Sequence, residues 1–360
     1  MKGGTPRNGS TMADKPKDTA RELPLANASP AHSFRSTDPA RTARAIWYTA
    51  PGAVEIRLSE LPSLEPGQAL VRTAFSGISR GTERLVISGA VGQEEWERMR
   101  APLQEGAFPF PVKYGYCATG TVEEGPAALA GRTVFCLHPH QDRFIAPVEM
   151  LVPLPDNVPV RRATLAANME TALNAIWDSG ASAGDRIVVV GAGIVGLLVG
   201  HLAARLPGAD VTVVDIADRH GIVTNLGARF ATPADAPRNA DVVFHTSASA
   251  AGLATAIACA GLEATVVELS WYGNKDVPSP LGGAFHSQRL KLQSSQVGQV
   301  SPGRRPRWSY RRRIEKALAL LADPALDVLV TEEIAFNDAP VALPRILSPG
   351  AAGLAPVIRY

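Results

Sequence analysis

Cysteine is scarce in this chain of 360 residues, which contains only three: Cys117, Cys136 and Cys259. They lie far apart, are odd in number and form no CxxC pair. This pattern excludes a disulfide framework and is typical of a protein from a reducing compartment. We therefore expect a cytoplasmic protein.

An excess of charge of one sign is also missing. The chain has 36 Lys and Arg residues against 34 Asp and Glu residues, a formal net charge of +2, so no electrostatic field favours nucleic acid or anionic lipid. Arginines between residues 304 and 313 interleave with Trp308 and Tyr310, as in some nucleic-acid patches. The near-zero net charge instead favours a solvated helix face there, and we expect no nucleic-acid partner.

Long apolar runs are absent too. The longest, from Ile187 to Gly200, has 14 residues, fewer than the ~18 to 20 needed to span a membrane. The first 42 residues have no apolar core and no periodicity, and they are rich in Pro, Ser, Thr and Asn. We expect no membrane association, no signal peptide and a disordered extension over residues 1–42.

The stretch around which the chain is organised begins at Ile187. Residues 187–190 are a short β-branched run, typical of a buried parallel strand. Glycines follow in GxGxxG register at positions 191, 193 and 196. The first permits a tight turn, the second lets a pyrophosphate approach the backbone, and the third lets a helix pack on the strand. The helix N-terminus at Ile194 and Val195 adds free N–H groups for the phosphates.

A second apolar strand over residues 211–214 ends in Asp215, 19 residues after Gly196. This spacing is close to the ~20 residues expected of an acidic group that accepts hydrogen bonds from the adenosine ribose. Because a carboxylate repels a 2′-phosphate, the sequence favours NAD. Arg219 lies nearby and keeps NADP open as the less favoured cofactor.

Strand signals surround this unit. Short apolar segments separated by Pro and Gly occupy 45–49, 53–58 and 68–75, and they are typical of a small curved antiparallel domain. From Ala163 the pattern changes to a helix over 163–179. Strands near 187–190, 211–214, 241–245, 264–269 and 289–293 then alternate with helical stretches, which predicts a doubly wound parallel sheet. A further helix is expected over 311–321.

With this order of elements, from about Arg44 to the C-terminus, the chain resembles the medium-chain dehydrogenase/reductase superfamily, the relatives of zinc-type alcohol and polyol dehydrogenases. The resemblance implies an α/β fold in which a GroES-like β-barrel catalytic domain is joined to a Rossmann doubly wound parallel sheet. It places the catalytic domain at residues 43–167 and 306–360 and the NAD(P)-binding domain at 168–305. Many relatives are dimers, so it also implies a homodimer.

The zinc ligands of the family are missing. Zinc-dependent members use the Cys of a GIC motif, the His of a GHE motif and a third residue before the first long helix. The matching positions hold Ser79, Tyr116 and Ala167, which do not make a zinc site. The resemblance thus implies an enzyme without zinc. One alternative stays open, a new ligand set drawn from Cys117, His138, His140 and Glu170.

Without a metal, the charge that builds on the substrate oxygen must be met by hydrogen-bond donors or a general acid. Tyr116 takes the place of the lost histidine, and Ser79 that of the lost cysteine. Thr82 matches the proton-relaying hydroxyl of relatives if one residue is inserted after Ser79. His138 and His140 titrate near neutrality and are expected either to exchange the substrate proton or to be surface loop residues.

Further site residues follow from the resemblance. Thr171 matches a threonine that touches the nicotinamide, and Ser270 follows the fifth strand, where relatives line the nicotinamide pocket. Arg80 is either a pyrophosphate ligand or a surface charge. Glu170 is either catalytic or a carboxylate that favours a helix N-terminus.

We therefore expect a zinc-independent oxidoreductase that transfers a hydride between NAD(H) and a small alcohol or carbonyl. The polar loop His138–Asp142 indicates a hydroxylated substrate, namely a sugar, a polyol or a heterocycle. Two alternatives remain: an NADPH-dependent quinone or enone reductase, against which Asp215 argues, and a non-catalytic NAD-binding protein.

Overall fold

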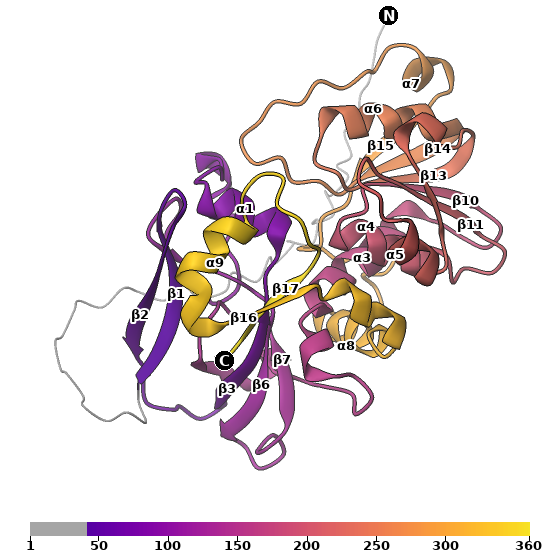
Figure 1. Cartoon of the computed structure of the whole chain (residues 1–360). Helices are drawn as coiled ribbons and strands as arrows, with labels where there is room; N and C mark the ends of the chain where they lie inside the picture. Colours follow the sequence, from indigo (N-terminus) through magenta and orange to yellow (C-terminus); the bar gives the residue numbers. More distant parts are fainter. Residues whose placement is uncertain (1–41) are drawn as a thin grey trace, which may run out of the picture. The chain divides into compact units, whose positions relative to one another are not determined.

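The structure is a computed structural model that describes residues 42–360 (Figure 1). The extension expected over residues 1–42 lies outside this range except for Thr42, which begins the first strand. Within the range, no helix combines the length and the apolar character needed to cross a bilayer. The three cysteines are free and buried, in agreement with the expected lack of disulfides.

Two sheets of short strands form the first part of the described chain (Figure 1). The 4-stranded sheet has the order β2 (Ala53–Glu60), β1 (Thr42–Ala50), β5 (Val112–Lys113), β4 (Glu105–Gly106). The 7-stranded sheet has the order β16 (Glu332–Ala335), β17 (Pro356–Arg359), β3 (Gln68–Gly77), β6 (Ala118–Glu124), β7 (Thr133–Cys136), β9 (Val152–Pro153), and β8 (Arg143–Pro147) also pairs with β3.

The end of the chain returns to these first strands. β17 runs antiparallel to β3, with Val357 opposite Gly77. β16 lies parallel to β17. An apolar core joins both ends of the sequence, because Ile46 and Val86 belong to the same buried cluster as Leu343. The last 30 residues are therefore needed to complete the part of the fold that begins at residue 42.

The third sheet is parallel throughout. Its order is β12 (Arg229–Ala231), β11 (Asp210–Val214), β10 (Arg186–Val190), β13 (Ala240–His245), β14 (Ala260–Glu268), β15 (Lys291–Ser294). The expected strands are present, with β14 beginning four residues earlier than the pattern predicted. β12 has only three residues, too few to produce an alternating pattern, and was not predicted.

Both faces of the parallel sheet are buried, which explains the continuous β-branched run of β10. Ile187 and Val189 point into one core, together with Leu197 of α4 (Ile194–Ala203). Val188 and Val190 point into another, on the side of α6 (Ala250–Cys259). Successive side chains of a strand alternate between the two faces of the sheet. In a strand covered on both faces all side chains are therefore buried and apolar.

The helices cover these sheets. Their bounds are α1 Arg80–Ile87, α2 Val160–Ala163, α3 Ala166–Ser179, α4 Ile194–Ala203, α5 His220–Asn225, α6 Ala250–Cys259, α7 Ala284–Ser287, α8 Tyr310–Leu320 and α9 Ala339–Ile346. The predicted helix over 163–179 is α3, which begins three residues later than expected, and the short helix α2 ends at Ala163. α3 ends at Gly180, which has the left-handed φ of +71° that glycine tolerates at a helix C-terminus.

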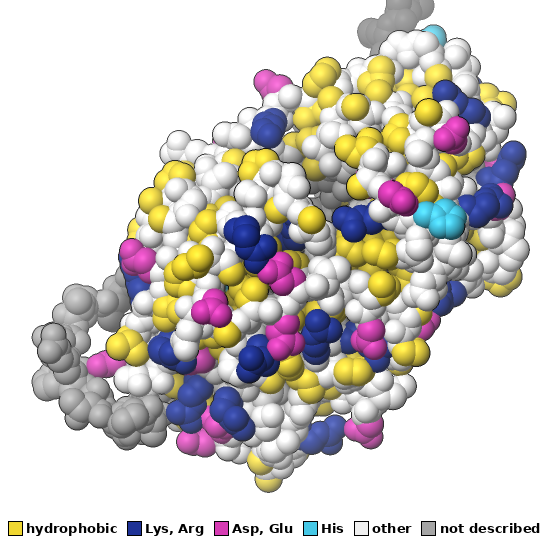
Figure 2. Space-filling view, in the orientation of Figure 1, with side chains coloured by type: hydrophobic (Ala, Val, Ile, Leu, Met, Phe, Trp, Pro, Cys, Tyr) yellow, Lys and Arg dark blue, Asp and Glu magenta, His cyan; other side chains and the backbone are white. Residues whose placement is uncertain are grey.

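The arginine cluster is only partly a solvated helix face. Arg313 on α8 has just 2% of its side chain exposed and pairs with Glu170 of α3 at 2.9 Å. Its guanidinium also donates to the Asn174 side chain at 2.7 Å. The expectation of a solvated face is therefore wrong for Arg313, whose charge holds α8 against α3. On the face in Figure 2, blue and magenta side chains alternate and neither sign forms a continuous patch.

Candidate functional site

The glycine turn lies between β10 and α4. Gly191 has a φ of +113°, and a Cβ there would lie 2.8 Å from the Ser247 backbone nitrogen. A Cβ on Gly196 would lie 1.9 Å from the Gly191 carbonyl oxygen. Gly193 differs, because a Cβ there would meet no atom within 4 Å. Positions 191 and 196 thus require glycine for the fold, whereas Gly193 leaves space open in front of the helix that begins with Ile194 and Val195.

Asp215 closes this turn from the neighbouring strand. One carboxylate oxygen accepts the backbone N–H of Ala192 at 2.5 Å, and the other accepts that of Ala217 at 2.8 Å. The half-buried side chain therefore lies beside the glycine turn, as the spacing predicted. Each carboxylate oxygen has further lone pairs available for ribose hydroxyls. The turn and this acid fit a dinucleotide.

The three predicted hydroxyl residues meet at one point. The Tyr116 hydroxyl contacts Ser79 Oγ at 2.5 Å and Thr82 Oγ1 at 3.2 Å. Burial raises the pKa of Tyr116 first of all, with the Cys117 thiol adding to the effect, so the phenol keeps its proton at neutral pH. Two residues that the sequence match put at zinc-ligand positions, Ser79 and Tyr116, are thus in contact through their hydroxyl groups.

A buried polar chain fixes this cluster from behind. The Glu83 carboxylate accepts the Ser79 backbone N–H at 2.7 Å and the Tyr48 hydroxyl at 2.6 Å. The same carboxylate lies 3.0 Å from His140 Nε2, and His140 Nδ1 lies 2.7 Å from Ser76 Oγ. Glu83 was missed in the sequence, although it lies four residues after Ser79, on the turn of α1 that faces back to it.

The structure changes the expected position of both loop histidines, which lie in the interior of the protein. His140 has no exposed surface and both of its ring nitrogens have partners. His138 is 4% exposed and stacks on Phe144 with ring centroids 3.8 Å apart. The alternative of surface loop residues is therefore wrong for both, and an exchange of the substrate proton stays a prediction. The loop that carries them is buried because β8, the strand that follows it, pairs with β3.

Glu170 is buried and paired with a side chain of α8, and a catalytic role for it stays a prediction. The carboxylate is committed to Arg313, and burial raises its pKa while the Arg313 charge opposes the rise. Its neighbour Thr171 is half-buried and donates its hydroxyl to the Ala167 carbonyl within α3. A nicotinamide contact by Thr171 stays a prediction. The helix N-terminus alternative for Glu170 is wrong, since the partner is a side chain of α8.

Arg80 lies against the loop between α9 and β17, residues 347–355. Its guanidinium donates to the backbone carbonyls of Ile346, Ala351 and Gly353. Burial lowers the pKa of Arg80, and the charges of Arg84 and Arg219 lower it further. The alternative of a free surface charge is therefore wrong, and a pyrophosphate contact stays a prediction.

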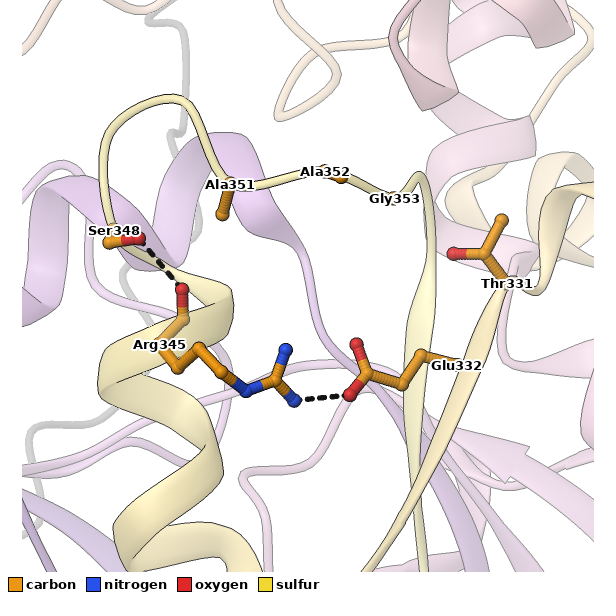
Figure 3. Close-up of a pocket in the computed structure, with 7 residues that line it drawn as sticks. All are labelled: Thr331, Glu332, Arg345, Ser348, Ala351, Ala352 and Gly353. Atoms are coloured by element: carbon orange, nitrogen blue, oxygen red, sulfur yellow. Dashed lines mark hydrogen bonds and ion pairs between the residues drawn. The ribbon is translucent and has the colours of Figure 1, made fainter.

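That same loop borders the pocket in Figure 3, which lies between β16 and α9. Glu332 and Arg345 form an ion pair in it, and the Ser348 hydroxyl donates to the Arg345 carbonyl at 2.8 Å. The pocket contains none of the predicted catalytic or cofactor residues. Its lining comes entirely from residues 331–353, so it does not define the candidate site.

Zinc does not fit the residues present. The three family positions hold two hydroxyl groups and the methyl group of Ala167, a donor set that does not satisfy the tetrahedral N and S preference of zinc. The alternative set of Cys117, His138, His140 and Glu170 is not assembled either. Among residues 42–360, no three His, Cys, Asp or Glu side chains are placed to share a metal ion.

A second polar group, missed in the sequence, lies at the carboxyl ends of β13 and β14. His245 Nδ1 lies 2.7 Å from Glu268 Oε2 there. Ser247 Oγ lies 2.7 Å from His245 Nε2. The predicted cofactor residue Ser270 belongs to this group, because its N–H donates to Glu268. The available signal was position, since ligands bind at the carboxyl ends of parallel strands.

Comparison with known proteins supports the fold. No family model matches the chain. The uncharacterized zinc-type alcohol dehydrogenase-like protein of Haemophilus influenzae is 37% identical over 73 residues, which is 20% of this chain and 21% of that protein. The match thus spans about a fifth of the relative's length.

Solved structures match over almost all of the described residues. L-idonate 5-dehydrogenase of Escherichia coli has a TM-score of 0.73 at 15% identity and covers 89% of this chain and 98% of its own. A protein of Sinorhizobium meliloti described as a zinc-binding dehydrogenase, bound to NADP, has a TM-score of 0.70 at 18% identity over 89% and 99%. These likenesses confirm the expected barrel and Rossmann architecture.

The open space at Gly193 gives a test of dinucleotide binding. Gly193→Ala places a methyl group where the pyrophosphate is expected, without strain, since φ is −75°. NADH affinity, measured by fluorescence titration, should fall by about tenfold or more, a cost of about 1.4 kcal/mol, with Tm unchanged. Gly221→Ala, also free of contacts, is the matched control. Unchanged NADH affinity in Gly193→Ala would place the dinucleotide elsewhere.

The burial of His138 predicts a pH dependence of stability. Burial lowers the pKa of His138 from 6.5 to about 3. Between these values the unfolded chain binds the proton and the folded chain does not, so the free energy of unfolding falls as pH falls below 6.5, by up to about 1.4 kcal/mol per pH unit. His138→Gln should remove this contribution. Parallel stability curves of both proteins in urea between pH 4 and 6.5 would contradict the assignment.

Proposed function

We propose that this chain, which has the fold of the medium-chain dehydrogenases/reductases, is an NAD(H)-dependent oxidoreductase that interconverts a small alcohol and its carbonyl compound. The observation that carries the proposal is the contact between Asp215 and Ala192, which places a carboxylate beside a glycine turn shaped for a pyrophosphate. When bound, NAD supplies the hydride acceptor. The chain supplies binding, orientation and one proton.

The residues that would hold the cofactor belong to the third sheet. Gly193 and the N-terminus of α4 are available for the pyrophosphate, and Asp215 for the adenosine ribose. Asp215 favours NAD because its charge repels a 2′-phosphate. Arg219 four residues later is the opposing feature, and one structural neighbour was solved with NADP. NAD is therefore the preferred cofactor in the proposal.

The substrate oxygen would be met by the hydroxyl cluster of Tyr116, Ser79 and Thr82. Negative charge develops on that oxygen as the hydride leaves or arrives, and preorganised donors stabilise it. The Tyr116 phenol keeps its proton at neutral pH and is held by two hydroxyl neighbours. The proposed reaction needs no zinc, since the donor set at these positions does not fit that metal.

The substrate class rests on the neighbours rather than on the loop. The polar residues of His138–Asp142 indicated a hydroxylated substrate. Because His138, His140 and Gln141 are buried, this loop no longer supports that substrate class. The name of the L-idonate 5-dehydrogenase neighbour points to a sugar acid. We keep a small hydroxylated compound, either a sugar or a polyol, as the proposal. Homodimer formation stays a prediction.

Two alternatives are separated by cofactor choice and turnover. A quinone or enone reductase would consume NADPH and act without an alcohol. A non-catalytic protein would bind NADH and turn over none of these compounds. L-idonate and D-sorbitol with NAD, and a benzoquinone with NADPH, are suitable first probes of the three functions.

The cofactor preference depends on Asp215. Asp215→Ala should weaken NADH by about tenfold or more, because a ribose hydrogen-bond acceptor is lost, and should weaken NADPH less, because repulsion of the 2′-phosphate is relieved. Fluorescence titration with both cofactors measures the ratio. Asp218→Ala, an exposed acid three residues on, is the control. An equal loss for both cofactors would refute the ribose contact.

The oxygen-binding role depends on the Tyr116 hydroxyl. Tyr116→Phe should lower kcat about 100-fold, the usual cost of one oxyanion donor, and leave the NADH Kd within about twofold. Tyr310→Phe, which removes a half-exposed hydroxyl on α8, is the control. Zinc content measured on the same samples completes the test. Unchanged kcat in Tyr116→Phe, or one zinc per chain, would contradict the metal-free mechanism.

A further inference from the structure

The ends of β13 and β14 carry a hydrogen-bonded row of three side chains. His245 and Glu268 are register partners on these parallel strands, so their side chains leave the sheet on the same face. His245 Nδ1 lies 2.7 Å from Glu268 Oε2, and His245 Nε2 lies 2.7 Å from Ser247 Oγ. His245 has no exposed surface, whereas Ser247 is exposed. The row therefore runs from the interior to the solvent.

The neighbouring helix leaves room for this row. α6 passes close enough that a Cβ on Gly252 would lie 2.0 Å from Ser247 Oγ and 2.8 Å from His245 Nε2. Only a residue without a side chain keeps the serine–histidine contact. Ser249 adds a second hydroxyl 3.0 Å from Ser247 Oγ.

The protonation of the row follows from the donors around Glu268. Burial raises the pKa of Glu268, but hydrogen bonds from His245 and Ser270 outweigh it and lower the pKa overall. The Tyr272 hydroxyl donates to the same carboxylate at 3.2 Å. A carboxylate is an acceptor only, so neutral His245 must present N–H at Nδ1. Its Nε2 lone pair then faces the Ser247 hydroxyl.

The position of the row relates it to the proposed cofactor site. β10, β11 and β12 proceed in one direction across the sheet, and β13, β14 and β15 proceed in the other. A dinucleotide lies across the point where the strand order reverses, here between β10 and β13. Asp215 at the end of β11 marks the adenosine half. The other half therefore lies on the side of Ser247, whose backbone nitrogen borders Gly191.

The same region also reaches the barrel. The segment after Glu268 runs toward α1, where a side chain at position 273 would meet the Ala90 carbonyl oxygen at 2.5 Å. Trp271 of this segment packs on the same apolar cluster as Tyr116. The segment that follows Glu268 is thus in contact with the barrel elements that hold the hydroxyl cluster.

We propose that Ser247, His245 and Glu268 form a proton relay for the hydride-transfer site, with Ser247 Oγ as the group that touches the substrate. This inference rests on the proposed function. In alcohol oxidation the substrate loses a hydride from carbon and a proton from its hydroxyl group. Ser247 Oγ accepts that proton as its own moves to His245 Nε2, and the imidazolium pairs with Glu268. The proton then passes to solvent, and reduction reverses the sequence.

Turnover and its pH profile test the relay in the holoenzyme, with NAD and either L-idonate or D-sorbitol. Ser247→Ala and Glu268→Gln should each lower kcat about 100-fold and leave the NADH Kd within about twofold. Thr255→Val, which removes a hydroxyl that donates to Ala251 within α6, is the matched control. A kcat within about twofold of wild type in Ser247→Ala would overturn the relay.

The pH profile separates a relay from a structural role. The titratable groups facing the imidazole are Glu268 and Tyr272, while β10 and α6 present Val190 and Gly252. If the row relays the proton, the pH dependence of kcat in the wild type should therefore change in Ser247→Ala. A profile of the same shape in both proteins would contradict the relay.

A measurement without cofactor keeps the relay distinct from the proposed function. In ¹⁵N NMR of the cofactor-free protein above neutral pH, His245 should be the Nδ1–H tautomer. The Nε2–H tautomer would overturn the relay even if the enzyme is active. If wild type turns over no probe, the proposed function fails while the tautomer still decides the arrangement. A burst of p-nitrophenyl acetate hydrolysis that is lost in Ser247→Ala would instead assign an acyl-transfer serine.

Discussion

The Glu83 carboxylate is the group on which the barrel part of the structure depends. It has no exposed surface, and a buried carboxylate is tolerated only when its oxygens are hydrogen-bonded. Its partners are the Ser79 backbone, Tyr48 of β1 and His140. Through His140 it reaches Ser76 of β3, whose hydroxyl contacts Tyr360 at 2.8 Å. One acid thus ties the start, the middle and the end of the described chain.

This anchoring has a consequence for the hydroxyl cluster. A metal would fix the orientation of its ligands by coordination, whereas free hydroxyl groups rotate. Here the Ser79 backbone is held by Glu83, and the Tyr116 phenol is held by Ser79 and Thr82. Donors that are already oriented cost no reorganisation when charge develops on a substrate. Glu83 therefore helps to orient the hydroxyl groups of this cluster, a task that a metal would perform by coordination.

The elements that were predicted from the sequence are those with a local physical cause. The β10 run, the glycines and Asp215 are fixed by strand burial, turn geometry and spacing, and all lie where they were expected. Ser79 and Tyr116 were singled out by matching family positions, and the structure adds that their hydroxyl groups are in contact. The burial of His138 and His140 could not be predicted, because it depends on pairing of β8 with β3, more than 60 residues apart in the chain. The ion pair of Glu170 could not be predicted for the same reason, since its partner Arg313 is 143 residues away.

His245 shows how topology adds what composition omits. In the sequence it is one polar residue at the end of an apolar strand, and Glu268 is another. Only the parallel register places them opposite each other, and only Gly252 on α6 leaves space for Ser247 to complete the row. The barrel cluster has donors but no imidazole that reaches the surface. The sheet supplies an imidazole whose single free lone pair ends at an exposed hydroxyl. In the proposed reaction the charge on oxygen and the proton are therefore handled by different parts of the chain.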